Sequence, residues 1–314
     1  MDRIPVVAVV GPTATGKSRL AVALALAFGG EVVSADSMQI YRGIPVGTAQ
    51  PTEEEMRGVP HHLIGFLPPE KPFSVADYTA LASDRIEKIR QRGRLPILAG
   101  GTGLYVSSLL HGIRFSPGGR DGALRARLLK RAETEGPEAL WRELRQFDPR
   151  AAERIHPNNV GRTVRAIEIY RTTGVTMTEQ IERSREKPSP YDVCMIGLDY
   201  RDRRKLYESI GRRVDAMMER GLLDEAKRVL AFGGAATAAQ AIGYKEFGPY
   251  LSGERDLSEA VEQVKRETRR YAKRQRTWFR RKERAEWIFL DEFPDFEAVC
   301  RRACGILRER GRAE

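Results

Sequence analysis

The sequence of 314 residues contains few cysteines and no long apolar run. Its three cysteines, Cys194, Cys300 and Cys304, are unevenly placed, and the last two lack the second pair of ligands that a zinc site needs. No segment approaches the roughly 20 apolar residues that cross a bilayer, and no charged-then-apolar leader precedes the apolar run at 6–10. These absences predict a protein without membrane association that works in a reducing compartment, and we expect it in the cytoplasm.

A phosphate-binding loop follows that apolar run. Residues 6–18 read VVAVVGPTATGKS, in which Gly11 is followed by four residues and then by Gly16, Lys17 and Ser18. Glycines let the backbone curl so that N–H groups point inward, and the following helix adds the positive end of its dipole. We expect Lys17 to supply a point charge and the Ser18 hydroxyl to bind Mg²⁺. The loop predicted to hold a polyphosphate consists of Gly11, Pro12, Thr13, Ala14, Thr15, Gly16, Lys17 and Ser18.

A strongly basic segment near the C-terminus predicts an anionic partner larger than one diphosphate. The chain has a formal net charge of +11, and residues 265–284 contain eleven Lys or Arg and two Glu, which leaves a charge of +9 on this segment. In a helix, the mainly apolar residues of this segment fall along one stripe, and most of its arginines lie on the remaining surface. The stripe consists of Val261, Val264, Thr268, Tyr271, Gln275 and Trp278. A face of one sign repels itself unless a polyanion neutralises it, so the segment favours a nucleic-acid partner over a merely solvated helix.

Apolar strand candidates separated by helical patterns predict an α/β fold, with the mainly parallel sheet of a P-loop NTPase-like core. The candidates are Val6–Val10, Glu31–Ser34, Leu95–Ala99 and Val193–Leu198. Between breakers at 116–122 and 186–192 the chain shows three amphipathic helical patterns and no strand pattern, which indicates a helical insertion domain. These patterns are ALRARLLKRAE, EALWRELRQF and VGRTVRAIEIYRTTG. We assign residues 1–116 and 193–314 to the core and residues 117–192 to the insertion.

Asp36 follows the carboxyl end of the second candidate strand, in the sequence SADSMQIYRG. Open α/β sheets bind ligands at the carboxyl ends of their strands, so Asp36 is expected on the same edge as the phosphate loop. A carboxylate there can take a proton from a nucleophile or help to hold Mg²⁺. Spacing alone does not separate these two roles from each other, or from a turn or helix-cap aspartate.

Several classes of phosphate-loop protein find no support in the sequence. No Asn-Lys-x-Asp element that reads guanine is present, which argues against a GTPase. The strand LPILA runs into Gly100, Gly101, Thr102 and Gly103 rather than into the acidic pair of a motor ATPase, and this glycine turn suits close approach of a substrate. A small-molecule or nucleotide kinase stays open, and so does a non-catalytic RNA-binding protein.

His61 and His62 invite a metal-binding interpretation. Adjacent residues of an extended segment point to opposite faces, so the two rings do not readily chelate one ion. We predict a structural or RNA-proximal role for both histidines.

Five sequence blocks in family order resemble the tRNA dimethylallyltransferases, the bacterial isopentenyltransferases that modify the adenosine immediately 3′ of the anticodon. The blocks are GPTATGKS, SADSMQIYRGIPVGTAQPT, VPHHLIGFLPPEKPFSVADY, ILAGGTGLYV and TRRYAKRQRTWFRR. The resemblance spans nearly the whole chain. It implies transfer of a dimethylallyl group from dimethylallyl diphosphate to the adenine N6 of tRNA, with release of diphosphate. It also implies a Mg²⁺ cofactor and action as a monomer.

The resemblance assigns catalytic roles around the diphosphate. Asp36 is implied to accept the N6 proton, and Thr13 to hydrogen-bond the bridging oxygen. Lys17, with the rest of the loop, is implied to stabilise the leaving diphosphate, and Arg213 is a further diphosphate contact. Ser209 stands where the family often has an arginine, so this chain departs from the pattern in the same helix.

The resemblance also assigns contacts with the tRNA anticodon stem-loop. Asp36, Ser37, Met38 and Gln39 are implied to hold the adenosine, and the helical insertion is implied to grip the stem-loop. The remaining positions that match RNA contacts of the family are Thr102, Arg125, Gly161, Arg162, Thr163, Val164 and Arg165. Arg162 and Arg165 lie three residues apart, on roughly one helix face.

Overall fold

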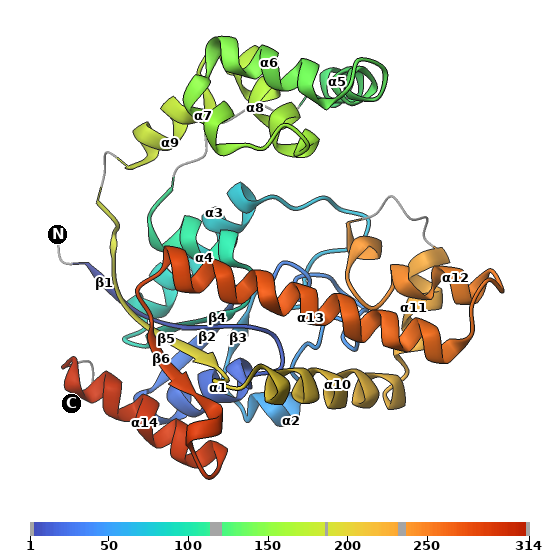
Figure 1. Cartoon of the computed structure of the whole chain (residues 1–314). Coiled ribbons are helices and arrows are strands. Elements are labelled where there is room, and N and C mark those ends of the chain that lie inside the picture. Colours follow the sequence, from blue (N-terminus) through green and yellow to red (C-terminus); the bar gives the residue numbers. More distant parts are fainter. Residues whose placement is uncertain (1–2, 114–120, 186–187, 232–236, 312–314) are drawn as a thin grey trace. The chain divides into compact units, whose positions relative to one another are not determined.

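The computed structural model describes residues 3–113, 121–185, 188–231 and 237–311. The chain divides into two compact units (Figure 1): unit 1 comprises Met1–Leu110 and Pro190–Glu314, and unit 2 comprises His111–Ser189. The boundary expected between residues 116 and 117 lies outside the described residues. The second boundary falls at 189/190 rather than 192/193, because a strand begins at Tyr191 and Ile4 donates a backbone hydrogen bond of 2.8 Å to the Pro190 carbonyl.

Unit 1 is built on a parallel sheet, which has six strands in the described residues, in the order β3-β2-β4-β1-β5-β6. The strands are β1 (Ile4–Val10), β2 (Gly30–Ser34), β3 (His61–His62), β4 (Leu95–Gly100), β5 (Tyr191–Asp199) and β6 (Glu286–Phe289). The four strand predictions are confirmed as β1, β2, β4 and β5. The sequence does not predict β3 and β6, because two and four residues are too short to show a periodic pattern.

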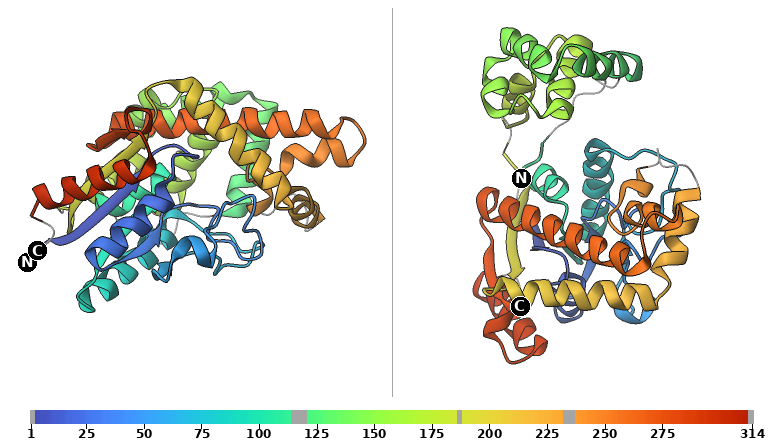
Figure 2. Two further views of the ribbon diagram at one scale, coloured as in Figure 1. Left: turned by 90° about the horizontal axis from the view of Figure 1, so that it is seen from below. Right: turned by 45° about the vertical axis from the view of Figure 1, so that its right-hand side comes forward.

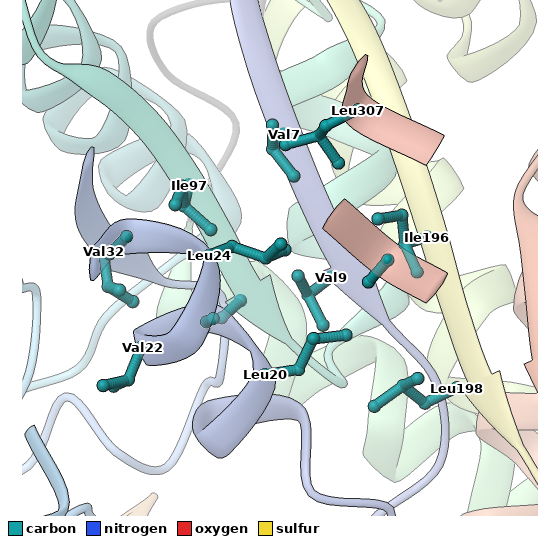
Figure 3. Close-up of a cluster of buried hydrophobic side chains, with 14 of the residues drawn as sticks. Val7, Val9, Leu20, Val22, Leu24, Val32, Ile97, Ile196, Leu198 and Leu307 are labelled. Carbon is teal, nitrogen blue, oxygen red and sulfur yellow. The ribbon is translucent and has the colours of Figure 1, made fainter. Parts of the chain in front are cut away.

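Helices cover both faces of this sheet. Successive side chains of β1 point to opposite faces, and apolar residues on both faces need to be buried. The helices of unit 1 are α1 (Lys17–Phe28), α2 (Glu53–Met56), α3 (Val75–Gln91), α4 (Gly103–Leu110), α10 (Arg203–Glu219), α11 (Leu222–Ala231), α12 (Gly248–Leu251), α13 (Leu257–Lys282) and α14 (Phe296–Glu309). Val7 and Val9 pack with α1 and α14 in the cluster that Figure 3 shows, whereas Val6, Ala8 and Val10 face α3, α4 and α13. Each fully buried valine contributes about 1.5–3 kcal/mol, so this two-sided core fixes the strand whose end carries the phosphate loop.

A third hydrophobic core, which includes Tyr41 and Leu222, packs the segment that follows β2 against α11. The Glu225 carboxylate on α11 is 1% exposed and accepts the N–H groups of Val46, at 3.0 Å, and Gly47, at 2.6 Å. It also accepts the hydroxyl of buried Tyr244, at 2.8 Å. These bonds fasten residues 44–48 to α11. The helices α10 and α13 pack side by side along this part of unit 1 (Figure 2).

Unit 2 is helical in its described residues. Its helices are α5 (Gly122–Thr134), α6 (Pro137–Phe147), α7 (Pro149–Arg154), α8 (Val160–Thr173) and α9 (Met177–Arg185). Their apolar sides form one core around Leu128, Leu144 and Ile167, and the three predicted helices are confirmed as α5, α6 and α8. The sequence does not predict α7 and α9, which buried Asp148 links by accepting the Ala151 N–H at 3.1 Å and the Thr178 hydroxyl at 2.6 Å.

Across both units, none of the described helices is long and apolar enough to span a membrane.

Candidate active site

The phosphate loop connects β1 to α1 in a tightly curled conformation. Gly11 has φ = 138°, and a side chain there would collide with the Leu198 carbonyl of β5, so the loop lies directly against the neighbouring strand. Inside the loop, the Pro12 carbonyl accepts hydrogen bonds from Thr15 Oγ1, at 2.9 Å, and from Lys17 Nζ, at 2.7 Å. The loop therefore holds its shape through its own contacts before any ligand binds.

A cavity of about 800 Å³, here called the larger cavity, opens beside this loop. The predicted site residues that line it are Thr13, Ala14, Thr15, Gly16, Lys17, Ser18, Asp36, Gln39 and Arg213. The structure thus gathers the loop, the end of β2 and helix α10 around one space.

Two half-buried cations, Lys17 and Arg213, face the larger cavity. Burial lowers the pKa of Lys17 from 10.5 to about 7, and the charge of Arg213 lowers it further, whereas Asp36 opposes the shift. Burial also lowers the pKa of Arg213, and Asp36 and Glu55 oppose that shift. Because both cations are withdrawn from water and repel each other, an anion bound between them relieves an existing electrostatic penalty.

The end of β2 and the glycine turn after β4 are joined beside this cavity. The Asp36 carboxylate accepts the N–H of Met38 at 2.9 Å, which forms a turn of the kind that the sequence left open as an alternative role. The Thr102 hydroxyl accepts the Ser37 N–H at 2.9 Å and donates to Ser37 Oγ at 3.2 Å. Gln39 donates to the Ala49 carbonyl at 2.9 Å. The predicted adenosine-binding residues and Thr102 therefore form one connected wall.

A second cavity of about 310 Å³, here called the smaller cavity, meets the larger one. Ser37, Met38 and Arg274 are among the residues that line the smaller cavity only. The residues that line both cavities are Thr13, Asp36, Arg213, Met217 and Tyr271. Asp36, the predicted base, therefore stands where the two spaces meet.

Three further residues support this site, and the sequence analysis assigns none of them a role in it. Gln275 on α13 accepts the Thr13 N–H at 2.9 Å and donates to the Gly101 carbonyl at 3.0 Å. Tyr271, one turn earlier, lines both cavities, and burial together with the charge of Asp36 raises its pKa. Ser209 donates to the Ala14 carbonyl at 2.8 Å, so the residue that departs from the family pattern contacts the loop. The helical stripe signals Gln275 and Tyr271 only as buried residues, and the departure from the family is the one signal for Ser209.

The larger cavity offers oxygen donors for Mg²⁺. The Ser18 hydroxyl and the Asp36 carboxylate both line it. In the described parts of the chain, no group of three or more His, Cys, Asp or Glu side chains could hold a metal ion. Mg²⁺ commonly binds through one or two protein oxygens together with substrate phosphates and water. The donor set therefore fits a Mg²⁺ ion that binds with a diphosphate.

The predicted stem-loop residues of unit 2 separate into an exposed group and a buried group. Arg125 and Arg165 are 44% and 37% exposed at their side chains, and both reach Glu168, which is 2% exposed. Their guanidinium nitrogens lie 3.7 and 2.9 Å from its carboxylate. Thr163 and Val164 are fully buried in unit 2, so in this structure neither presents a surface to RNA, and their role is to pack α8 into the unit.

Gly161 and Arg162, the other predicted stem-loop residues of unit 2, are exposed at the start of α8. The sequence offers no sign that Glu168 joins Arg125 to Arg165, because glutamate on a helix is usually solvated.

The basic segment lies on α13, with the predicted stripe directed inward. Val264 and Gln275 are buried, and the other four stripe residues are partly buried. Part of the charge has a structural role, since Arg276 and Arg280 pair with fully buried Asp199 at 2.8 and 2.7 Å. Exposed basic residues outside the stripe include Arg266, Lys273, Arg274 and Arg281. The interpretation of a helix with a packed stripe and a basic outer face is confirmed.

The two histidines have the structural environment that the sequence predicts. His62 Nε2 lies 2.7 Å from Glu31 Oε2, and His61 Nδ1 lies 2.8 Å from the Val59 carbonyl. Each ring is thereby engaged by a different neighbour beside β3.

Fold and site together define a P-loop α/β protein that binds a phosphorylated ligand beside a second cavity. A family model described as IPP transferase matches residues 39–282, and one described as isopentenyl transferase matches residues 4–67. The tRNA dimethylallyltransferase of Caldanaerobacter subterraneus is 48% identical over 299 residues, which cover 94% of this chain and 95% of that protein. That of Bacillus subtilis is 47% identical over 294 residues, covering 93% of each.

Solved structures agree with the sequence relatives. The tRNA isopentenylpyrophosphate transferase of Bacillus halodurans aligns with a TM-score of 0.71 at 46% identity, over 98% of both chains. A eukaryotic dimethylallyltransferase captured acting on tRNA aligns with a TM-score of 0.77 at 32% identity, over 88% of this chain and 69% of that one. This chain belongs to the tRNA dimethylallyltransferase family. The resemblance is therefore confirmed, and the kinase alternative is not favoured.

Proposed function

We propose that this enzyme transfers the dimethylallyl group of dimethylallyl diphosphate to N6 of the adenosine 3′ of the anticodon in tRNA. The observation that carries the proposal is the meeting of two cavities at Thr13, Asp36 and Arg213. The larger cavity has the loop and cations that suit a diphosphate. The smaller cavity has room for a base and is walled by Ser37 and Met38. A reaction between the two ligands then occurs at Asp36.

The phosphate loop acts on the leaving group. As the C–O bond of the allylic diphosphate breaks, its electron pair leaves with the diphosphate, where Lys17 and Arg213 face the growing charge. Preorganised cations in a site withdrawn from water are most effective at that stage. The Thr13 hydroxyl is proposed to hydrogen-bond the bridging oxygen. A Mg²⁺ ion held by Ser18 supplies further charge neutralisation when it is bound.

Asp36 is the proposed base. The N6 amine forms the new C–N bond with the allylic carbon, and the proton that N6 loses passes to the Asp36 carboxylate. The products are N6-dimethylallyladenosine in the tRNA and free diphosphate. The adenosine must leave its stack to enter the smaller cavity, and a loop base requires less unstacking energy than a base in a duplex.

The basic surfaces are proposed to bind the tRNA. Unit 2 contributes the predicted stem-loop residues Arg125, Arg162 and Arg165, and α13 contributes exposed charges such as Arg274, which also lines the smaller cavity. Side chains from one chain wall both cavities, and we propose that the enzyme acts as a monomer. Its tRNA substrate makes the cytoplasm the proposed location.

The test is a transfer reaction with purified protein, Mg²⁺, dimethylallyl diphosphate and unmodified tRNA that reads codons beginning with U. Mass spectrometry of the digested tRNA should find a dimethylallyl adduct on the adenosine 3′ of the anticodon. A parallel reaction with ATP in place of dimethylallyl diphosphate should leave the tRNA and added nucleosides unchanged. Consumption of ATP with transfer of its phosphate, and no adduct in the first reaction, would overturn the proposal in favour of a kinase.

A further inference from the structure

Gln275 occupies an unusual position between two parts of the site. It lies on the buried face of α13 and is 4% exposed. Its Oε1 accepts the Thr13 N–H at 2.9 Å, and its Nε2 donates to the Gly101 carbonyl at 3.0 Å. The amide therefore has a specified orientation, with the acceptor toward the phosphate loop and the donor toward the glycine turn.

In the proposed reaction, the two segments that Gln275 bonds serve different substrates. Thr13 is in the phosphate loop, whereas Gly101 directly precedes Thr102, whose hydroxyl accepts the Ser37 N–H on the wall of the smaller cavity. A side chain at Gly101 would collide with Gln275 Nε2, so glycine is required for this close approach. One amide thus joins the diphosphate loop to the adenosine wall.

We propose that Gln275 is a positioning residue that sets the separation and orientation of the phosphate loop relative to the adenosine wall. This inference rests on the proposed function. Gln275 acts through Thr13, since its bond fixes the backbone of the residue whose hydroxyl is proposed to face the bridging oxygen. The same helix continues into the basic face, where the preceding residue Arg274 lines the smaller cavity. The helix that faces RNA therefore also sets the geometry of the diphosphate site.

The principal test is Gln275→Met, which keeps the side chain's length and removes both bonds. We expect kcat for transfer to fall about 100-fold, because small misplacements of reacting groups have effects of this size. Affinity for inorganic diphosphate should fall about tenfold, and affinity for the anticodon stem-loop should stay within about threefold of the wild type. A folded Gln275→Met protein with kcat within threefold of the wild type overturns the proposal.

A double-mutant cycle shows whether Gln275 acts through Thr13. Thr13→Val and Gln275→Met should combine to much less than the product of their single effects on kcat. Multiplicative effects would mean that the two residues act independently, which contradicts the proposal.

Gln275→Glu provides a second readout, the pH dependence of kcat, which a general loss of stability would not reproduce. When protonated, the introduced carboxyl can accept from Thr13 N–H and donate to the Gly101 carbonyl, whereas the carboxylate has no donor. The ratio of variant to wild-type kcat should therefore rise as pH falls from 8 to 6, and a flat ratio contradicts the two-bond geometry.

Gln263→Met is the matched control on the same helix. Among the described residues its amide donates to Glu267 Oε1 alone, one turn away at 3.2 Å, and kcat should not change. If the wild type forms no adduct while Gln275→Met still weakens diphosphate binding tenfold, the positioning role stands and the proposed transfer function fails. If transfer proceeds and Gln275→Met changes neither kcat nor diphosphate binding, the proposed transfer function stands and the positioning role fails.

Discussion

The larger cavity and the arginine pair of unit 2 both carry cations that we propose bind phosphate, yet the two sets of cations have different surroundings. In the cavity, Lys17 and Arg213 are half-buried, repel each other and have lowered pKa values. In unit 2, Arg125 and Arg165 are partly exposed and already share the Glu168 carboxylate. The first arrangement needs an anion to relieve repulsion, whereas the second is oriented in advance and open to screening by salt. Changes in the cavity should affect chemistry, and changes in unit 2 should affect RNA affinity.

The largest effect is expected from Lys17→Ala. Loss of this charge removes the stabilisation of the leaving diphosphate by a preorganised cation, and kcat/KM for transfer should fall about 1000-fold or more. Measured binding of the anticodon stem-loop should stay within about threefold of the wild type. Lys88→Ala, at an exposed lysine paired with Asp84, is the matched control and should not change transfer. Equal losses in RNA binding and in transfer would remove the contrast between the two regions.

The pH dependence of diphosphate binding is the second test. With a pKa of about 7 for Lys17 in the free enzyme, the lysine is increasingly neutral above pH 7 and must take up a proton to pair with the anion. Affinity should therefore fall by about tenfold for each pH unit well above 7. Calorimetry in buffers of different ionisation enthalpy should show proton uptake at pH 8. Lys17→Ala should show neither effect, and proton release by the wild type would contradict the account.

The arginine pair of unit 2 is tested by Glu168→Gln. Removing the buried carboxylate frees Arg125 and Arg165 from their shared partner, so the dissociation constant for the anticodon stem-loop should rise about tenfold. At saturating tRNA, kcat should be unchanged. Glu182→Gln, which breaks an exposed pair with Arg150 in the same unit, is the control. A fall in kcat at saturation, with RNA affinity intact, would place this cluster in the chemistry instead.

The smallest effects are expected on the basic face of α13. Lys273→Ala and Arg281→Ala should each weaken tRNA binding a few-fold and reduce the slope of log K against log salt concentration by about 1. Arg301→Ala, on α14 and paired with Glu297, should leave the slope unchanged. Unchanged slopes in the first two variants would mean that their charges do not contact phosphate.

The contrast between the two regions also shows which site residues can be predicted from the sequence. The phosphate loop is contiguous, so its spacing alone predicts Lys17 and Ser18 in one cavity, and strand ends place Asp36 at the same edge. The bond from Gln275 to Thr13 joins residues 262 positions apart, and no local pattern carries such information. The same limit applies to the contact of Ser209 with Ala14 and to the role of Glu168. The roles of these residues arise from packing between distant segments of the chain. Sequence periodicity can predict that such a residue is buried, but it does not predict its partner.

Single-turnover transfer by Asp36→Asn tests the central claim most directly, since Asp36 lies where the two cavities meet. Both substrates should be supplied at saturating concentrations, so that any change in affinity does not enter the rate. The account predicts bound tRNA and bound dimethylallyl diphosphate, with adduct formation at least about 100-fold slower than in the wild type. Adduct formation at the wild-type rate would contradict it.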